Sequence, residues 1–166
     1  MISRKYKLFF FSLLILSTIL ISVIFVTQGR FLITNTSSIS IEAFEVDYPV
    51  YLGNSLNWTG TLKPRIVDIK LLDSNKEKIA IGNTPIEVFI VEDGYIGVVT
   101  ENDISTSIDF FPTSNYLLLD DNFNIVFRLD SDSDKQFLEN ITGIWIDFSI
   151  FGINKSNVVD ISLIEN

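Results

Sequence analysis

Three aspartates at alternate positions, Asp130, Asp132 and Asp134, form the motif whose spacing points most directly to chemistry. The same spacing opens the calcium-binding loop of EF-hand proteins, in which carboxylate oxygens bind the cation. The rest of that loop pattern is missing. Lys135 stands at the sixth position, where glycine is required, and Ile141 stands at the twelfth, where a bidentate glutamate is required. This is therefore not an EF-hand.

A calcium ion could still bind these aspartates more loosely, with Glu139 as a further ligand. Calcium is the one cofactor that the sequence suggests, and we expect no other. The alternative is a solvated acidic loop that leads into a short helix at residues 133–140, because an acidic residue at a helix start interacts favourably with the helix dipole.

The composition removes several kinds of catalytic site. The chain of 166 residues contains neither histidine nor cysteine, which excludes disulfides, thiolate zinc sites and the usual serine–histidine pair. Paired carboxylates could still hydrolyse a glycosidic bond. We expect most of the 21 acidic residues to be solvated in turns or on polar strand faces. The chain is therefore not expected to be an enzyme, with a carboxylate-dependent glycoside hydrolase as an alternative.

Aromatic residues form the second candidate site. In residues 144–150 isoleucine or phenylalanine occupies every second position, which predicts a strand with these side chains in the core. Trp145 and Phe151 then face outward, and Phe89 faces outward on its own strand by the same alternation. Such an exposed aromatic face could bind a glycan, another ligand or a protein. The alternative is that a loop or the short helix covers it, or that inside and outside are reversed.

The elements that must position these residues begin with an apolar segment. Residues 8–26 contain no charge, proline or glycine. As a helix, this run of 19 residues spans about 28 Å, close to the ~30 Å hydrocarbon core of a bilayer. We therefore expect a transmembrane signal-anchor. The alternatives are a cleaved signal peptide and a buried helix of a soluble core.

Basic residues set the expected orientation and the domain boundaries. Arg4, Lys5 and Lys7 precede the apolar segment and only Arg30 closely follows it, which places the amino terminus in the cytoplasm. We expect a cytoplasmic segment at residues 1–7, the anchor at 8–26, a short stalk at 27–37 and an extracytoplasmic domain at 38–166. The protein would then be a single-pass cell-membrane protein, and the composition is typical of a bacterial source.

The charge of the exported part limits its partners. Beyond Arg30 the chain carries 8 basic and 21 acidic residues, a net charge of −13. Nucleic acid is therefore not an expected partner, because phosphate binding needs a basic patch. Adhesion to anionic lipid is disfavoured for the same reason. The simplest role of this charge is solubility.

The exported part reads as strands joined by polar turns. Apolar residues, mostly isoleucine, valine and phenylalanine, recur with a period of two in eight to ten short segments, while no segment except residues 133–140 suggests a helix. Trp58 is expected in the core beside Leu56. One-sided alternation favours an all-β fold of two antiparallel sheets packed as a sandwich, with a closed barrel as the alternative.

Turn residues predict how these strands connect. Gly53-Asn54 reads as a turn before the strand that carries Trp58, and residues 73–76 read as a four-residue turn after a strand with Val67 on its inner face. Glu92-Asp93-Gly94, between two apolar runs, is the clearest hairpin signal of the chain.

The segment of residues 49–72 resembles part of an immunoglobulin-like ectodomain. It contains a predicted glycine turn, a strand with an inward tryptophan and then an alternating strand. The cysteine pair of antibody domains is missing. The resemblance implies a fold and carries no functional residues.

Together these features predict a membrane-anchored, extracytoplasmic, non-catalytic domain that binds another protein or an envelope component. The main alternative is an accessory or structural subunit of a membrane complex that acts through its transmembrane helix. The sequence does not name the partner.

Overall fold

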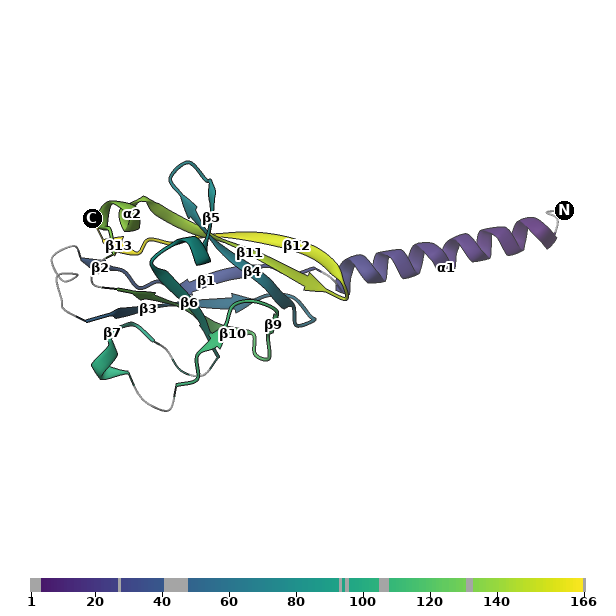
Figure 1. Ribbon diagram of the computed structural model, residues 1–166. Helices are drawn as coiled ribbons and strands as arrows, with labels where there is room; N and C mark the ends of the chain where they lie inside the picture. Colours follow the sequence, from purple (N-terminus) through teal and green to yellow (C-terminus); the bar gives the residue numbers. More distant parts are fainter. Residues whose placement is uncertain are drawn as a thin grey trace.

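The computed structural model describes residues 4–26, 28–40, 48–92, 94, 96–104, 108–130 and 133–165. A long amino-terminal helix projects from one end of a β-rich domain, and the carboxyl terminus lies at the opposite end (Figure 1). The elements follow one another as α1 (Arg4–Val26), β1 (Phe31–Asn35), β2 (Ile39–Ser40), β3 (Val50–Trp58), β4 (Arg65–Asp73), β5 (Lys78–Ala80), β6 (Ile86–Val91), β7 (Val98–Thr100), β8 (Phe111–Pro112), β9 (Tyr116–Leu117), β10 (Asn122–Leu129), α2 (Lys135–Asn140), β11 (Ile141–Ile150), β12 (Ile153–Asp160) and β13 (Ile164–Glu165), with short 3-10 helices at Ile81–Asn83 and Glu101–Asp103.

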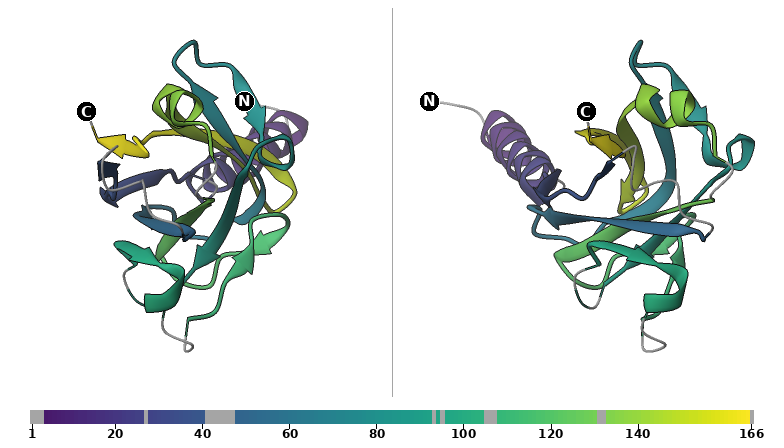
Figure 2. Two further views of the ribbon diagram at one scale, coloured as in Figure 1. Left: turned by 60° about the vertical axis from the view of Figure 1, so that its left-hand side comes forward. Right: turned by 90° about the vertical axis from the view of Figure 1, so that its left-hand side faces the viewer.

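The strands form two main sheets. The first sheet has the order β1-β3-β10-β6-β8, with β7 paired to β3 beside β1, and the second has the order β12-β11-β4-β5, with β9 paired to β4. Among the described residues, all strand pairs in both sheets are antiparallel, whereas the small β13-β2 pair is parallel. The prediction of a mostly β fold with antiparallel sheets is therefore confirmed. Figure 2 shows the strands gathered in one body with α1 beside it.

One hydrophobic core takes side chains from both sheets. The alternation in residues 144–150 places its isoleucines and phenylalanine inside, as predicted, and Trp58 is 2% exposed. The Trp58 ring lies 5.3 Å from that of Phe148 on the second sheet, and both rings contact Phe31 of β1. These contacts bury apolar surface that would otherwise face water, which stabilises the packing of the two sheets against each other.

Three sequence-based expectations about strands and turns are wrong. Gly53-Asn54 is not a turn but lies within β3. A Cβ at Gly53 would overlap the backbone of Ile96, so the glycine permits a close approach of the neighbouring chain rather than a reversal. The expected stalk is also too long, since β1 begins at Phe31 and pairs with β3. Val67 is exposed, because a β-bulge in β4 opposite β11 shifts the alternation by one residue.

The predicted hairpin at Glu92-Asp93-Gly94 also does not form. The strand before it, β6, pairs with β10 and β8, whereas the strand after it, β7, pairs with β3. Asp93 lies outside the described residues. Glu92 accepts hydrogen bonds from the backbone amides of Leu119 and Asp120 at 2.6 and 3.3 Å. The chain therefore crosses the outer face of the first sheet instead of folding back beside β6.

This crossing segment covers the outer face of the first sheet. Ile96 packs there against Tyr51, Val91 and Val126, with partly buried side chains from the segment around Phe110. The first sheet is therefore apolar on both faces. The turn at residues 73–76 agrees with its prediction, and Asp73 Oδ1 accepts hydrogen bonds from the amides of Asn75 and Glu77 at 2.9 and 2.7 Å.

Helix α1 projects from the domain instead of packing into its core. Its described apolar side chains are largely exposed, Phe10 for example by 63%, so the alternative of a buried helix in a soluble core is wrong. Within the part of the chain that the structure describes, no helix combines the length and the apolarity needed to cross a membrane. That α1 spans a membrane therefore stays a prediction.

The chain passes from α1 to β1 through a tight junction. A Cβ at either Gly29 or Gly60 would overlap the ring of Trp58, so the two glycines pack directly on this core residue. Thr59 Oγ1 accepts a hydrogen bond from the Arg30 amide and donates one to the Arg30 carbonyl, both at 3.1 Å. The residues that follow α1 are thus fixed to the end of the domain.

Candidate binding face

The outer face of the second sheet carries the candidate site that centres on Trp145. In the antiparallel register Trp145 of β11 lies opposite Val158 of β12 on one side and Lys70 of β4 on the other. Asp147 lies opposite Ser156 and Asp68 in the same way. Residues opposite one another in an antiparallel pair share a face. Three strands therefore present one continuous surface.

Two polar neighbours hold the half-buried Trp145 ring. The indole Nε1 donates a hydrogen bond to Asp147 Oδ1 at 2.6 Å. Lys78 Nζ of β5 lies 3.3 Å from the ring centroid, in a cation–π contact. Such contacts contribute about 0.5–1 kcal/mol at exposed sites. They fix the ring on the face without removing it from solvent.

Lys70 lies between two carboxylates on the same face. Its Nζ is 2.8 Å from Asp147 Oδ2 and 3.0 Å from Asp68 Oδ2. Hydrogen bonds to Asp147 and then Asp68 raise the pKa of Lys70. Partial burial alone would raise the pKa of Asp147, but hydrogen bonds from Lys70 and Trp145 outweigh it and lower that pKa. Lys70 and Asp147 are therefore both charged at neutral pH.

The face combines exposed apolar surface with charges that are already paired. Val158 beside Trp145 is 45% exposed, and Val67 near the β-bulge is also exposed. Aromatic and apolar area rimmed by charged groups is the composition of protein interaction surfaces. A general acid of glycoside hydrolysis needs a raised pKa instead. The arrangement thus favours recognition over acid–base chemistry.

The other two aromatic residues of the predicted site do not join Trp145. Phe89 lies on β6 of the first sheet, half-buried, with its ring 5.4 Å from that of Phe110. Phe89 belongs to the face that the crossing segment covers. For this residue, the alternative that a loop covers the aromatic side chain is therefore correct. Phe151 lies beyond the end of β11, in the turn to β12, with φ of 51°. The predicted three-residue aromatic row is therefore not formed.

Two of the predicted calcium ligands have other partners in the structure. Asp130 forms an ion pair with Arg128 at 3.0 Å. Asp134 is the N-cap of α2, and its side chain accepts a hydrogen bond from the Gln136 amide at 3.0 Å. Asp132 lies outside the described residues. Among those described, no cluster of three or more potential metal ligands occurs, and Glu139 is on α2. Asp134 thus has the helix-start role of the alternative interpretation.

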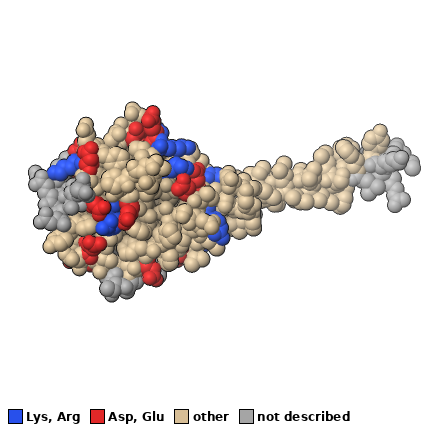
Figure 3. Space-filling model, viewed as in Figure 1, with Lys and Arg blue, Asp and Glu red and all other residues tan. Residues whose placement is uncertain are grey.

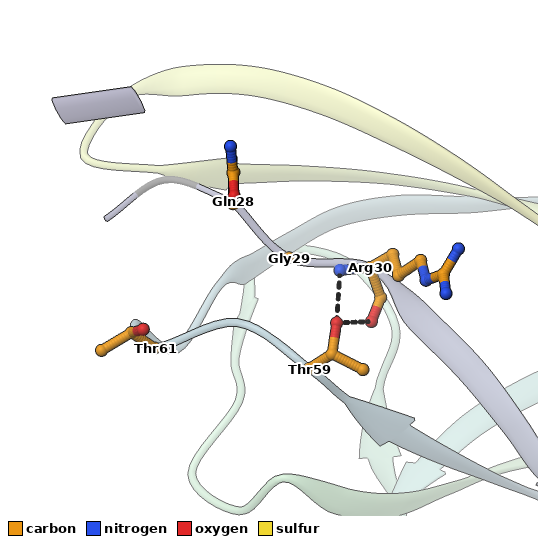
Figure 4. A pocket seen from close by; sticks show the side chains of 5 residues that line it. All are labelled: Gln28, Gly29, Arg30, Thr59 and Thr61. Atoms are coloured by element: carbon orange, nitrogen blue, oxygen red, sulfur yellow. Dashed lines mark hydrogen bonds between the residues drawn. The ribbon is translucent and has the colours of Figure 1, made fainter. Parts of the chain in front are cut away.

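A shallow hollow lies at the junction between α1 and the domain. Its volume is about 440 Å³, and it is lined by Gln28, Gly29, Arg30, Thr59 and Thr61. Figure 4 shows Thr59 hydrogen-bonded to the backbone of Arg30, whose side chain points away from it. The hollow is open, and its lining contains no carboxylate, thiol or imidazole group. We therefore interpret the hollow as a feature of the tight junction and not as a ligand site.

Sequence reasoning found Trp145 but missed the groups around it. Lys78, Lys70 and Val158 lie far from Trp145 in the sequence and reach it only through strand pairing. The sequence of β4 gives a partial signal for this face, since Asp68 and Lys70 alternate with its apolar residues. No family model, curated protein or solved structure matches this chain.

Proposed function

We propose that the protein is a membrane-anchored, extracytoplasmic, non-catalytic domain that binds another protein or an envelope component through the outer face of its second sheet. The observation that carries this proposal is the exposed apolar helix α1. Figure 3 shows no charged side chain on α1 outside its grey amino-terminal end, in contrast to the domain, where both signs of charge are interspersed.

The exposed side chains of α1 need a cover other than water. Burying one large apolar side chain contributes about 1.5–3 kcal/mol, and most of the described positions of this helix carry such a side chain. The hydroxyls of Ser12, Ser17, Thr18 and Ser22 donate hydrogen bonds to carbonyls one turn earlier, at 2.8–2.9 Å. This pairing removes the main cost of placing them in lipid.

The full uncharged run of residues 8–26 is the basis for proposing that the anchor spans the bilayer. It is longer than residues 9–24, the continuous stretch whose side chains the structure describes. The basic residues before it support an amino terminus in the cytoplasm and a domain outside.

We further infer that the domain has the immunoglobulin-like arrangement of strands. In constant-type immunoglobulin domains strands A, B, E and D form one sheet and C, F and G the other. If β1, β3, β4, β5, β6, β10, β11 and β12 are assigned in chain order to A, B, C, C′, D, E, F and G, the first sheet reads A-B-E-D and the second reads G-F-C-C′. This agreement in strand order supports the fold, and it carries no function by itself.

Site-specific photo-crosslinking in the producing cells tests the proposed binding face. A photoreactive residue at Val158, beside Trp145, is compared with one at Val98 on the other sheet, a matched position because the two valines are 45% and 47% exposed. We expect a defined crosslinked partner from position 158 alone. Equal capture at both positions, or capture only from Val98, would refute the assignment of the face.

Replacing residues 8–26 by an unrelated membrane segment separates the two membrane-based functions. Retention of the partner assigns binding to the exported domain. Loss of the partner assigns it to the helix, as in the accessory-subunit alternative, which the same exposed apolar helix favours. Turnover of a glycan by the full chain that is abolished by one carboxylate substitution would contradict a non-catalytic role.

A further inference from the structure

The turn between β11 and β12 exposes a large apolar side chain in a strained conformation. Ile150 pairs with Ile153, so Phe151 and Gly152 form a two-residue hairpin loop. Their φ angles are 51° and 78°, both positive, as in a type I′ turn. The Phe151 side chain is 82% exposed.

Phenylalanine is a poor choice for this position on structural grounds. Asparagine, aspartate and glycine are preferred in type I′ turns because they tolerate positive φ, whereas a bulky residue there is an outlier. Holding a non-glycine residue in this region costs conformational free energy. The exposed ring gains little from packing within the domain to offset that cost. The stability of the fold therefore does not explain a phenylalanine at this position.

The turn lies at the same end of the domain as α1. The Asn157 side chain accepts a hydrogen bond from the Phe31 amide at 3.1 Å, which fixes β12 beside the start of β1. The loop residue Phe151 precedes Asn157 by six residues, or about 20 Å of extended strand. Helix α1 ends five residues before Phe31. Figure 1 shows the tip of the β11–β12 hairpin next to the base of α1.

The residues that flank the turn in the sequence carry no charge, unlike most of the domain. No charged residue occurs between Asp147 and Lys155, and Ile153 next to the loop is also exposed. Leu119 is exposed as well, but Asp120 and Asp121 follow it directly. The β11–β12 turn is thus an uncharged, apolar tip in a domain with a strongly negative charge.

From these observations we infer that Phe151, with Ile153 beside it, inserts into the interfacial region of the bilayer in which α1 is anchored. The inference rests on the proposed membrane anchor and adds a second point of contact. With α1 and the turn both in the membrane, the domain has a fixed orientation on its surface. The strand β11, which leads to this turn, carries Trp145 on the outer face of the second sheet. That face would then lie clear of the membrane surface and be accessible to partners.

The absence of native cysteine allows a direct test on the full chain. Single cysteines replace Phe151, Asn75 in the β4–β5 turn at the other end of β4, and Leu16 in α1. Each variant is labelled with an environment-sensitive fluorophore and reconstituted into phosphatidylcholine vesicles that contain lipids with a quencher near the headgroup. We expect a shift to shorter wavelength and lipid-dependent loss of intensity at position 151, and neither at position 75.

The Leu16 label separates failure of this inference from failure of the anchor. If the label at 16 is in lipid and the label at 151 behaves like that at 75, the turn does not enter the membrane. If the label at 16 is also in water, the proposed anchor itself is wrong. A wavelength shift at 151 without quenching by lipid would show that protein covers the turn, which also overturns the inference.

Discussion

At the scale of single residues, the chain places two aromatic side chains from one predicted strand in different settings. Trp145 lies on a sheet face, held by Asp147 and Lys78, whereas Phe151 lies at a hairpin tip with a positive φ. Both are reachable from solvent, but only Phe151 is placed against a backbone preference. This difference makes the turn the sharper target for substitution.

Replacing Phe151 by asparagine should stabilise the folded β domain. Asparagine adopts positive φ readily, so we expect the free energy of unfolding in detergent to rise by about 0.5–1 kcal/mol. Denaturant unfolding measures this difference. Phe151→Ala serves as the control, because it removes the ring but keeps the strain. A marked loss of stability in the asparagine variant would mean that the ring packs within the domain.

The ion pairs around Lys70 should give the fold a defined acid sensitivity. Because the folded state lowers the pKa of Asp147, this carboxylate stabilises the fold above its unfolded pKa of about 3.9, and the contribution is lost as pH falls through the lower folded value. Lys70 acts in the opposite direction, since its raised pKa gives a contribution that is lost only at strongly alkaline pH.

We therefore expect Asp147→Asn to flatten the pH dependence of unfolding at acidic pH. The difference from the native chain should be at most about 1 kcal/mol near pH 6 and should vanish as the native carboxylate becomes protonated. Chemical denaturation across this range measures it. Asp160→Asn, which removes a solvent-exposed carboxylate paired with Lys76, should leave the profile nearly unchanged. Identical profiles for both variants would contradict a special role of Asp147.

At the scale of elements, the junction between α1 and β1 depends on two glycines and one ring. Gly29 and Gly60 both lie against Trp58, which is itself part of the central core. A side chain at either glycine must displace the ring or separate the two segments. The junction therefore links the course of the chain after α1 to core packing.

Gly29→Ala or Gly60→Ala should each cost about 1–3 kcal/mol, because overpacking forces side chains out of their preferred positions. Thermal or denaturant unfolding in detergent, with the fluorescence of the tryptophans as the signal, measures this loss. Gly82→Ala is the matched control, since a Cβ there meets no atom within 4 Å, and it should be close to neutral. Equal effects at all three positions would show that the clash with Trp58 is not limiting.

At the scale of the whole molecule, the proposed anchor and the basic residues that precede it predict one orientation. In sealed membranes with the native orientation, external protease should remove the domain and leave a short membrane-protected fragment. Alkaline carbonate should not extract the full chain. A mature protein that begins near Arg30 and is free in the medium would instead support the cleaved signal peptide.

The local sequence pattern was sufficient to predict burial where one face of a strand packs against the core. The inward residues of β11, the burial of Trp58 and the turn at residues 73–76 all follow from alternation or turn chemistry. The short helix before β11 was also predicted, although it begins at Lys135. These features depend on contacts close in the sequence or on simple avoidance of water.

Pairing between strands that are distant in the sequence determined which residues form the candidate site. Strand register brings Lys70 and Val158 to Trp145, and a bulge that no local signal reveals exposes Val67. The partner of β7 is β3 rather than β6, so an apparent hairpin signal became a crossing segment that covers Phe89. Such pairings depend on which edges and faces remain free once the whole domain is packed.

The sequence alone determined the apolar run of residues 8–26, the charge of the domain and the absence of histidine and cysteine, because these properties need no neighbours. It also determined which residues of β11 turn away from water. Only the tertiary structure decided that the aromatic residues lie in three separate settings and that the hairpin tip with Phe151 stands beside α1. The reason is physical. A period of two determines on which face of a strand a residue lies, but the packing of segments distant in the sequence determines whether that face is covered or exposed.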